Sequence, residues 1–161
     1  MKRAVVLMLA VVCCIAVKAV LAEEGTPVRR ELGFGVYVGD VAGLNFKFWI
    51  SRRHALDFLL VWQGQERTYF HFDYIKHIYG KIQKGDISGE VPYYYGIGLR
   101  GDKIFAGGGN TSSGLRFVLG FNYLFKDMPA DIFMEIAPTA MLEPQVTGIL
   151  SVGMGARYYL D

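Results

Sequence analysis

The stretch Thr68 to His77, TYFHFDYIKH, holds two of the chain's three histidines with an aspartate between them. Imidazole and carboxylate groups bind metal ions and exchange protons in many catalytic sites. His71, Asp73 and His77 share the same parity, and alternate residues of a β-strand point to one face of the sheet. If this segment is a strand, the three groups therefore lie on the same face.

The spacing of the three groups disfavours a single metal site. Along an extended strand Asp73 lies ~7 Å from His71 and His77 lies ~20 Å away, at about 3.3 Å per residue. Only His71 and Asp73 could share one ion, and other strands would have to supply the remaining ligands. We therefore expect no metal site, no cofactor and no catalytic residue in this stretch.

The elements that must position these residues are strands, because period-2 alternation dominates the sequence from residue 32 onward. Phe70, Phe72 and Tyr74 alternate with His71 and Asp73 in the first stretch. The same pattern predicts eight strands, over 32–39, 44–50, 55–62, 68–77, 93–100, 115–125, 131–137 and 150–160. Gly, Asp, Asn, Ser and Pro mark the breaks between them. The longest breaks are 79–90 and the glycine-rich 101–113.

The first 22 residues have the layout of a helical secretory signal peptide. Lys2 and Arg3 precede a nearly unbroken apolar run from Ala4 to Val17, and Ala22 stands just before Glu23. Lys18 leaves the run short of the ~20 apolar residues of a membrane-spanning helix. We predict cleavage near Ala22, which gives a signal peptide over 1–22 and one domain over 23–161.

The mature chain carries almost no net charge. Lys2, Arg3 and Lys18 account for three of the 17 basic residues, so residues 23–161 hold 14 basic against 15 acidic ones, a net charge of −1. No basic excess remains to suggest nucleic acid as a partner. Both cysteines, Cys13 and Cys14, lie in the predicted signal peptide, so residues 23–161 contain no disulfide and no cysteine metal ligand.

The two faces of the predicted strands differ in a way that favours a transmembrane barrel. One face is Leu, Ile, Val, Phe and Tyr, whereas the other carries glycines and about one charged residue per strand. A soluble solvent-facing surface would hold more Lys and Glu. In a membrane barrel the apolar face meets lipid and the polar face fills the interior. We expect Trp62, Tyr69, Tyr93, Tyr123 and Tyr158 to form aromatic girdles, with Trp49 pointing inward.

An eight-stranded barrel has an interior just wide enough for side chains to fill it. We expect a structural, hydrogen-bonded network there rather than an open pore, because an unpaired buried charge is unfavourable. His71 and Asp73 are expected near Arg100 or Arg116. The predicted network consists of Lys47, Asp57, His71, Asp73, Arg100, Arg116, Glu135 and Arg157.

The closing stretch GMGARYYL (153–160) resembles the C-terminal signal by which the barrel assembly machinery recognises bacterial outer-membrane barrels. Gly155, Tyr158 and Leu160 match its alternating positions. With ALDF (55–58), YYGIGLR (94–100) and DIFMEIAP (131–138), it makes the mature chain resemble the small OmpA/OmpX-like eight-stranded barrels of uncharacterised function. The resemblance implies an antiparallel up-and-down barrel in the outer membrane, in contact with its lipids, but no established activity. We expect a monomer.

The sequence leaves two other functions open. A lipid A-modifying barrel hydrolase resembles a pattern in which serine follows histidine by two residues. His71-Phe72-Asp73 has aspartate there, and no hydroxyl or thiol is adjacent to act as a nucleophile. A soluble periplasmic lipocalin-like carrier would instead turn Phe70, Phe72, Ile97 and Leu99 inward around an apolar ligand. We expect a non-enzymatic outer-membrane barrel with a structural or surface-interaction role and at most a narrow pore. GDVAG (39–43), QGQER (63–67), 101–113 and MLEPQVT (141–147) would then face outside.

Overall fold

The computed structural model describes residues 31–63, 67–80, 89–104, 111–126 and 128–160. The predicted signal peptide lies outside these residues. The described part of the chain contains no helix, and hence none with the length and hydropathy needed to cross a membrane. Its strands are β1 (Leu32–Gly39), β2 (Ala42–Trp49), β3 (His54–Gln63), β4 (Arg67–Ile78), β5 (Gly89–Glu90), β6 (Tyr93–Ile104), β7 (Thr111–Phe125), β8 (Ala130–Glu143) and β9 (Thr147–Leu160).

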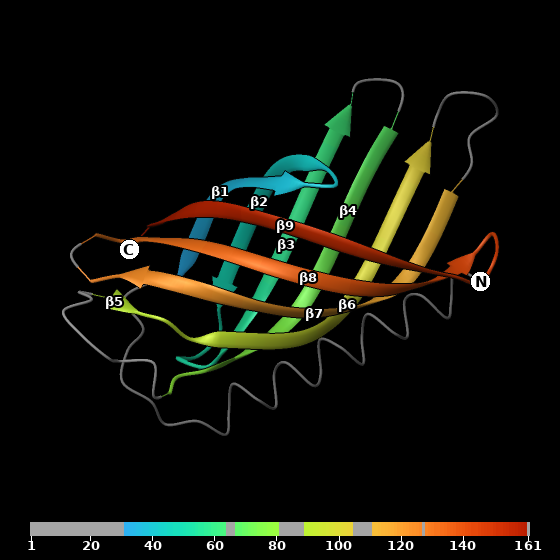
Figure 1. Ribbon diagram of the computed structural model, residues 1–161. Coiled ribbons are helices and arrows are strands. Elements are labelled where there is room, and N and C mark those ends of the chain that lie inside the picture. Colours follow the sequence, from blue (N-terminus) through green and yellow to red (C-terminus); the bar gives the residue numbers. More distant parts are fainter. Residues whose placement is uncertain (1–30, 64–66, 81–88, 105–110, 127, 161) are drawn as a thin grey trace.

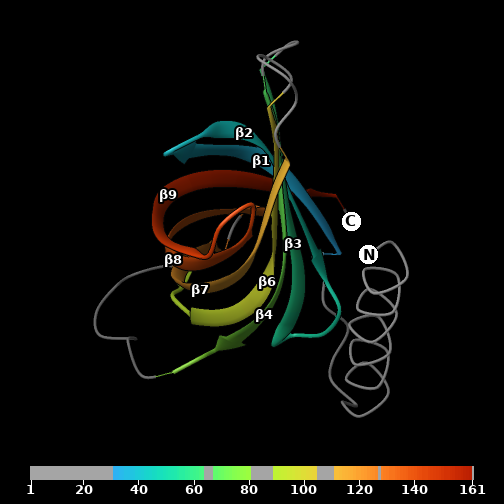
Figure 2. The same ribbon diagram turned by 90° about the vertical axis from the view of Figure 1, so that its right-hand side faces the viewer.

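The strands form a closed antiparallel barrel (Figure 1). Hydrogen-bonded neighbours follow the order β5-β7-β6-β4-β3-β2-β1-β9-β8, and a further pairing of β7 with β8 completes the ring. β5 pairs only with the end of β7, so the other eight strands make the wall. Figure 2, turned by 90°, shows this wall curving round on itself. The predicted all-β, eight-stranded barrel is confirmed. Closure leaves no full-length sheet edge exposed.

Several strands are longer than the apolar alternation predicted. β6 continues to Ile104, β7 begins at Thr111, and β8 runs to Glu143. The extra residues of β6 and β7 are mostly polar or glycine, so the apolar period stops there while the backbone ladder continues, as in the pairing of Lys103 with Thr111. The predicted loop 101–113 is therefore wrong in extent, and residues 105–110 lie outside the described part of the chain.

The strand predicted over 131–137 ends directly before Pro138, but β8 continues beyond it. Proline has no N–H to donate to a ladder, so it argues against a central strand. Here β8 passes through Pro138, which remains paired with Leu150 of β9. On its other side β8 pairs with β7, and that ladder is interrupted at the proline. Arg116↔Thr139 and Leu119↔Ile136 are paired, but the residues between them are not. The chain thus places the proline where one ladder is locally interrupted.

The predicted turn 79–90 is wrong at its end, where Gly89 and Glu90 form β5. They pair with Phe125 and Leu124 of β7. The N–H of Asn122 donates to the carbonyl of Pro92 at 2.9 Å, so β5 continues the line of β6 along β7. Residues 81–88 lie outside the described residues.

The two ends of the barrel differ in shape. We call the end where β1 begins and β9 finishes the terminal end, and the opposite end the hairpin end. β1 and β2 have 8 residues each, whereas β8 and β9 have 14. The last β1–β9 pair is Gly39↔Gly153, so β9 continues past β1 from Thr147 to Val152. Figure 1 shows the β1–β2 hairpin ending well short of the β8–β9 hairpin.

Candidate functional site

The barrel interior is polar and its outer wall is apolar. Phe70, Ile97 and Met134 are 43%, 49% and 53% exposed and point outward. A lipocalin-like carrier would need Phe70 and Ile97 inside, so the structure does not favour that alternative. All eight predicted interior residues are buried: Lys47, Asp57, His71, Asp73, Arg100, Arg116, Glu135 and Arg157.

Arg157 holds the interior network nearest the terminal end. Its Nε donates to Asp131 Oδ1 at 2.9 Å from the neighbouring strand. Its Nη1 donates to Asn45 Oδ1 at 3.0 Å and also to Asp57 on the far side of β1 and β2. Asn45 in turn donates to Asp57 at 2.5 Å. One guanidinium therefore joins β9, β8, β2 and β3.

Lys47 extends this network toward the end of β4. Its Nζ lies 2.9 Å from Nε2 of His77 and 4.0 Å from Oδ2 of Asp131. It also sits 4.4 Å from the centroid of the Trp49 ring. Such a position over an aromatic face stabilises a cation. The ammonium group is thus held by a carboxylate, an imidazole and a ring, while its side chain is fully buried.

Arg116 forms the second network, in the middle of the barrel. Its Nε donates to Asp73 Oδ2 at 2.8 Å, and its Nη2 donates to Glu135. The Tyr94 hydroxyl donates to the other oxygen of Glu135 at 2.9 Å. Charge-assisted bonds of this kind are among the stronger hydrogen bonds in proteins. Asp73 therefore lies beside Arg116, one of the two arginines near which it was predicted.

The histidines of the opening stretch are separated. His71 lies in the middle of the barrel, where Nδ1 is 3.0 Å from the Tyr69 hydroxyl and Nε2 is 3.8 Å from Asp73 Oδ2. His77 lies near the terminal end and contacts Lys47 and Trp49. Within the described part of the chain, no group of three His, Cys, Asp or Glu side chains is arranged to hold a metal ion.

A third network lies at the hairpin end. Arg100 Nε donates to Asp102 Oδ2 at 3.1 Å, and its Nη1 donates to Ser151 Oγ at 3.1 Å. The Ser151 hydroxyl donates to Asp40 Oδ2 at 2.9 Å, which ties β9 to the β1–β2 turn. Arg100 also lies 4.6 Å from the Tyr69 ring centroid. Arg100 therefore anchors the short hairpin to the taller side of the wall.

The sequence prediction missed several members of these networks. Their signal was available, because they share the inward parity of the predicted residues. The additional buried polar residues used here are Asn45, His77, Asp102, Asn122 and Asp131. With them, the described interior holds four basic residues against five acidic ones, rather than four against three. Asn122 donates to Asp131 at 2.6 Å, so amides also supply donors that the prediction assigned to charges alone.

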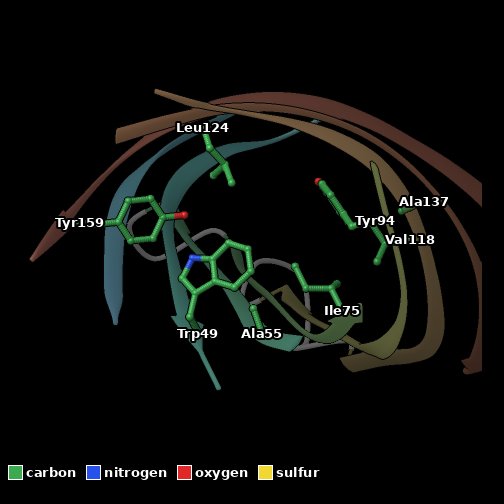
Figure 3. Packing of buried hydrophobic residues seen from close by; sticks show 8 residues of the cluster. All are labelled: Trp49, Ala55, Ile75, Tyr94, Val118, Leu124, Ala137 and Tyr159. Carbon is green, nitrogen blue, oxygen red and sulfur yellow. The ribbon is translucent and has the colours of Figure 1, made fainter. Parts of the chain in front are cut away.

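Aromatic rings fill the rest of the interior. Tyr69 was predicted to be part of a girdle, which is wrong, because it shares the inward parity of His71 and is buried. One apolar cluster contains Trp49, Tyr94, Tyr159 and smaller side chains (Figure 3). A second contains Tyr37, Tyr69 and Phe133. Trp49 points inward, as predicted.

Inward-facing glycines make room for these rings. A Cβ on Gly153 would overlap the ring of Tyr37, and one on Gly120 would overlap that of Tyr94. Glycine is the residue that permits such close approach to the backbone. Gly153 and Gly120 on the polar face therefore leave space for the rings of Tyr37 and Tyr94.

The fold and its filled interior define the class of an eight-stranded barrel with a charge-paired core and an apolar outer wall. A solved structure with the same fold is the N-terminal β-barrel domain of Pseudomonas aeruginosa OprF, with a TM-score of 0.53 and 12% sequence identity. The match covers 80% of this chain and 95% of that one. No family model and no curated protein sequence matches this chain. The likeness shows that the two chains share the same β-barrel fold.

Proposed function

We propose that this protein is a bacterial outer-membrane barrel that acts as a structural or surface-interaction element of the envelope. The observation that carries the proposal is the sidedness of the wall. Outward residues on all eight wall strands are predominantly large and apolar, whereas charged and amide side chains point inward. In water this arrangement would expose the apolar surface, and in a bilayer it buries that surface in lipid.

A closed interior supports a role other than general diffusion. The three arginine networks cross the barrel at different heights, and two aromatic clusters fill the space between them. Such an interior passes small solutes slowly if at all. A structural or binding role therefore suits this chain better than transport of solutes. We also propose that the protein has no enzymatic activity.

The hairpin end is the proposed outer surface, with both ends of the mature chain in the periplasm. The predicted signal peptide and the resemblance of the C-terminal strand to an assembly signal support this orientation. Gly155, Tyr158 and Leu160 lie on β9, where Tyr158 and Leu160 point outward. We propose that these residues form the assembly signal and that the protein is a monomer.

Fractionation combined with gel mobility tests the proposal. We expect the full chain, expressed in a bacterium with an outer membrane, to sediment with that membrane. A folded barrel resists SDS, so the unheated protein should migrate differently from the boiled protein. Recovery as a soluble periplasmic protein, with no shift in mobility on heating, would exclude the proposed location.

A further inference from the structure

β9 has a free strand edge at the hairpin end. β9 runs from Thr147 to Leu160, but its pairing with β1 stops at Gly39↔Gly153. In the described part of the chain β9 pairs with β1 and β8 alone, so beyond Gly153 one side of it has no neighbouring strand. The free edge begins where the short β1–β2 hairpin ends (Figure 1).

The edge consists of the backbone groups of Gly148 and Leu150. Successive residues of an antiparallel strand direct their N–H and C=O groups to opposite neighbours. The N–H of Tyr159 donates to the carbonyl of Pro129 on the β8 side at 2.7 Å, so the odd-numbered residues of β9 face β8 and the even-numbered ones face β1. The carbonyl of Val152 accordingly lies against β1. Beyond it, the N–H and C=O groups of Leu150 and Gly148 face the open side.

A charged group lies at the same level in the neighbouring hairpin. Asp40 is in the β1–β2 turn, and its side chain is 38% exposed. Its Oδ2 accepts a hydrogen bond from Ser151 Oγ at 2.9 Å, which places the carboxylate beside the residue that follows Leu150. A partly exposed carboxylate requires water or polar headgroups around it. The surroundings of the barrel are therefore polar at the level of Ser151.

The side chains and the backbone of the edge favour different surroundings. Leu150 is 67% exposed and Val146, in the β8–β9 turn, is 82% exposed. Apolar side chains alone would place both residues in hydrocarbon. Unpaired N–H and C=O groups oppose this, because hydrocarbon offers them no hydrogen bonds and open sheet edges do not occur in it. Loss of those hydrogen bonds outweighs the exposure of a leucine side chain to a polar layer.

The length of β9 agrees with a hydrocarbon boundary below the edge. β9 has 14 residues, more than the ~9–11 that a tilted strand needs to cross the hydrocarbon layer. The stretch from Val152 to Leu160 alone meets that need. Residues from Thr147 to Ser151 can therefore stand outside the hydrocarbon while β9 still spans it.

We propose that the polar headgroup layer of the outer leaflet covers the free edge of β9, and that the hydrocarbon boundary crosses β9 between Leu150 and Met154. Headgroups and their bound water supply the hydrogen bonds to the backbone of Gly148 and Leu150. Beside the β1–β2 hairpin, acyl chains reach no higher than the level of Gly39. This inference rests on the proposed membrane location, and it adds the depth at which the barrel sits in the bilayer.

Fluorescence quenching at single cysteines tests this boundary. In the full-length chain, Cys13→Ser and Cys14→Ser remove the native thiols. Gly148→Cys, Leu150→Cys and Met154→Cys then each carry one fluorophore on the outer face of β9. The labelled proteins are folded into phosphatidylcholine vesicles with a spin label either on the headgroup or deep in the acyl chain. Acyl-chain quenching should exceed headgroup quenching at Met154 and fall below it at Leu150 and Gly148.

A control position separates failure of the boundary from failure of the membrane location. Met134→Cys lies toward the middle of β8, which is paired on both sides, and its label should be quenched most by the acyl-chain probe. Heat-modifiable mobility establishes that each variant is folded. No atom lies within 4 Å of the Cβ position of Gly148, so Gly148→Cys replaces Leu150→Cys if the latter does not fold.

Two results would count against the proposals. Stronger acyl-chain than headgroup quenching at the edge positions overturns the boundary, while the membrane location stands. Absence of acyl-chain quenching at Met134 and Met154 in folded protein overturns the membrane location itself.

Discussion

Arg116 of β7 is hydrogen-bonded to Asp73 of β4 at 2.8 Å, although β6 separates these strands in the wall. The same guanidinium also contacts Glu135 of β8. Backbone ladders join only neighbouring strands, whereas this side chain links strands on both sides of its own. The interior thus adds a second set of connections to the closed sheet.

Removing Arg116 should destabilise the barrel strongly. Arg116→Met leaves the Asp73 and Glu135 carboxylates without their cation, and loss of one partner of a buried ion pair typically lowers stability by about 3–5 kcal/mol. Urea titration of the protein folded into lipid vesicles measures this change. Adding Asp73→Asn and Glu135→Gln should recover part of the loss, because no uncompensated charge then remains. If the changes in unfolding free energy from the three substitutions simply add, the three side chains do not interact as described.

Gly153→Ala should destabilise the barrel by about 1–3 kcal/mol, since its methyl group would overlap the Tyr37 ring and force it to move. Gly148→Ala on the same strand is the matched control, because no atom lies within 4 Å of its Cβ position. Equilibrium unfolding of both variants in vesicles makes the comparison. An equal loss of unfolding free energy in the two variants would show that the space Gly153 leaves for Tyr37 does not stabilise the barrel.

Met134→Arg and Leu142→Arg distinguish lipid from water outside the wall. The two side chains are 53% and 50% exposed, so a water-facing wall would tolerate both alike. In a bilayer, arginine near the midplane lowers stability by about 2–4 kcal/mol and near the interface by about 0–1 kcal/mol. Met134 lies toward the middle of β8 and Leu142 near its hairpin end. We expect a large loss of folding in vesicles only for Met134→Arg.

Zinc should not bind stoichiometrically to the His71, Asp73 and His77 set. His71 and Asp73 are engaged by Tyr69 and Arg116, and His77 by Lys47 at a different height. Calorimetric titration of Zn²⁺ into the folded protein checks this expectation. One-to-one binding that disappears in His71→Ala would contradict it.

Tyr158→Ala should reduce assembly in cells more than stability in vitro. Tyr158 is 50% exposed on the outer wall, so the folded barrel loses little packing when its ring is removed. Tyr95→Ala, with 43% exposure, is the control outside the C-terminal strand. The heat-modifiable fraction in cells should fall for Tyr158→Ala alone, while both variants refold alike into vesicles. An equal fall in the heat-modifiable fraction of both variants would show that Tyr158 has no specific role in assembly.

Alternation along the chain predicts the wall because covalent geometry sets which side chains share a face. Alternation alone therefore places Lys47, Asp57 and Arg157 inside, and it places Phe70 and Ile97 outside. The same parity would have included Asn122 and Asp131 and excluded Tyr69 from the girdle. These errors came from weighting residue type above position.

The partners inside the barrel depend on information that alternation does not contain. Arg157 meets Asp57 across the interior only because of the strand register and the curvature of the closed sheet. The ends of β6 and β7 were missed because their residues stop being apolar where the strands continue, and β8 continues past residue 137 through Pro138. Pro138 added to this error, since its interruption affects one ladder and spares the other.

An outward-facing position of the wall requires only an apolar side chain, because lipid has no fixed shape that the side chain must match. Val36, Met134 and Leu150 can each be exchanged for another apolar side chain with small effect. The interior is more demanding, because the Tyr37 and Tyr94 rings each need a glycine beside them. Arg116 likewise needs the carboxylates that it binds. Sequence drift is therefore expected to be fast outside and slow inside, and the slowly drifting interior is polar here, whereas in a water-soluble protein it is apolar.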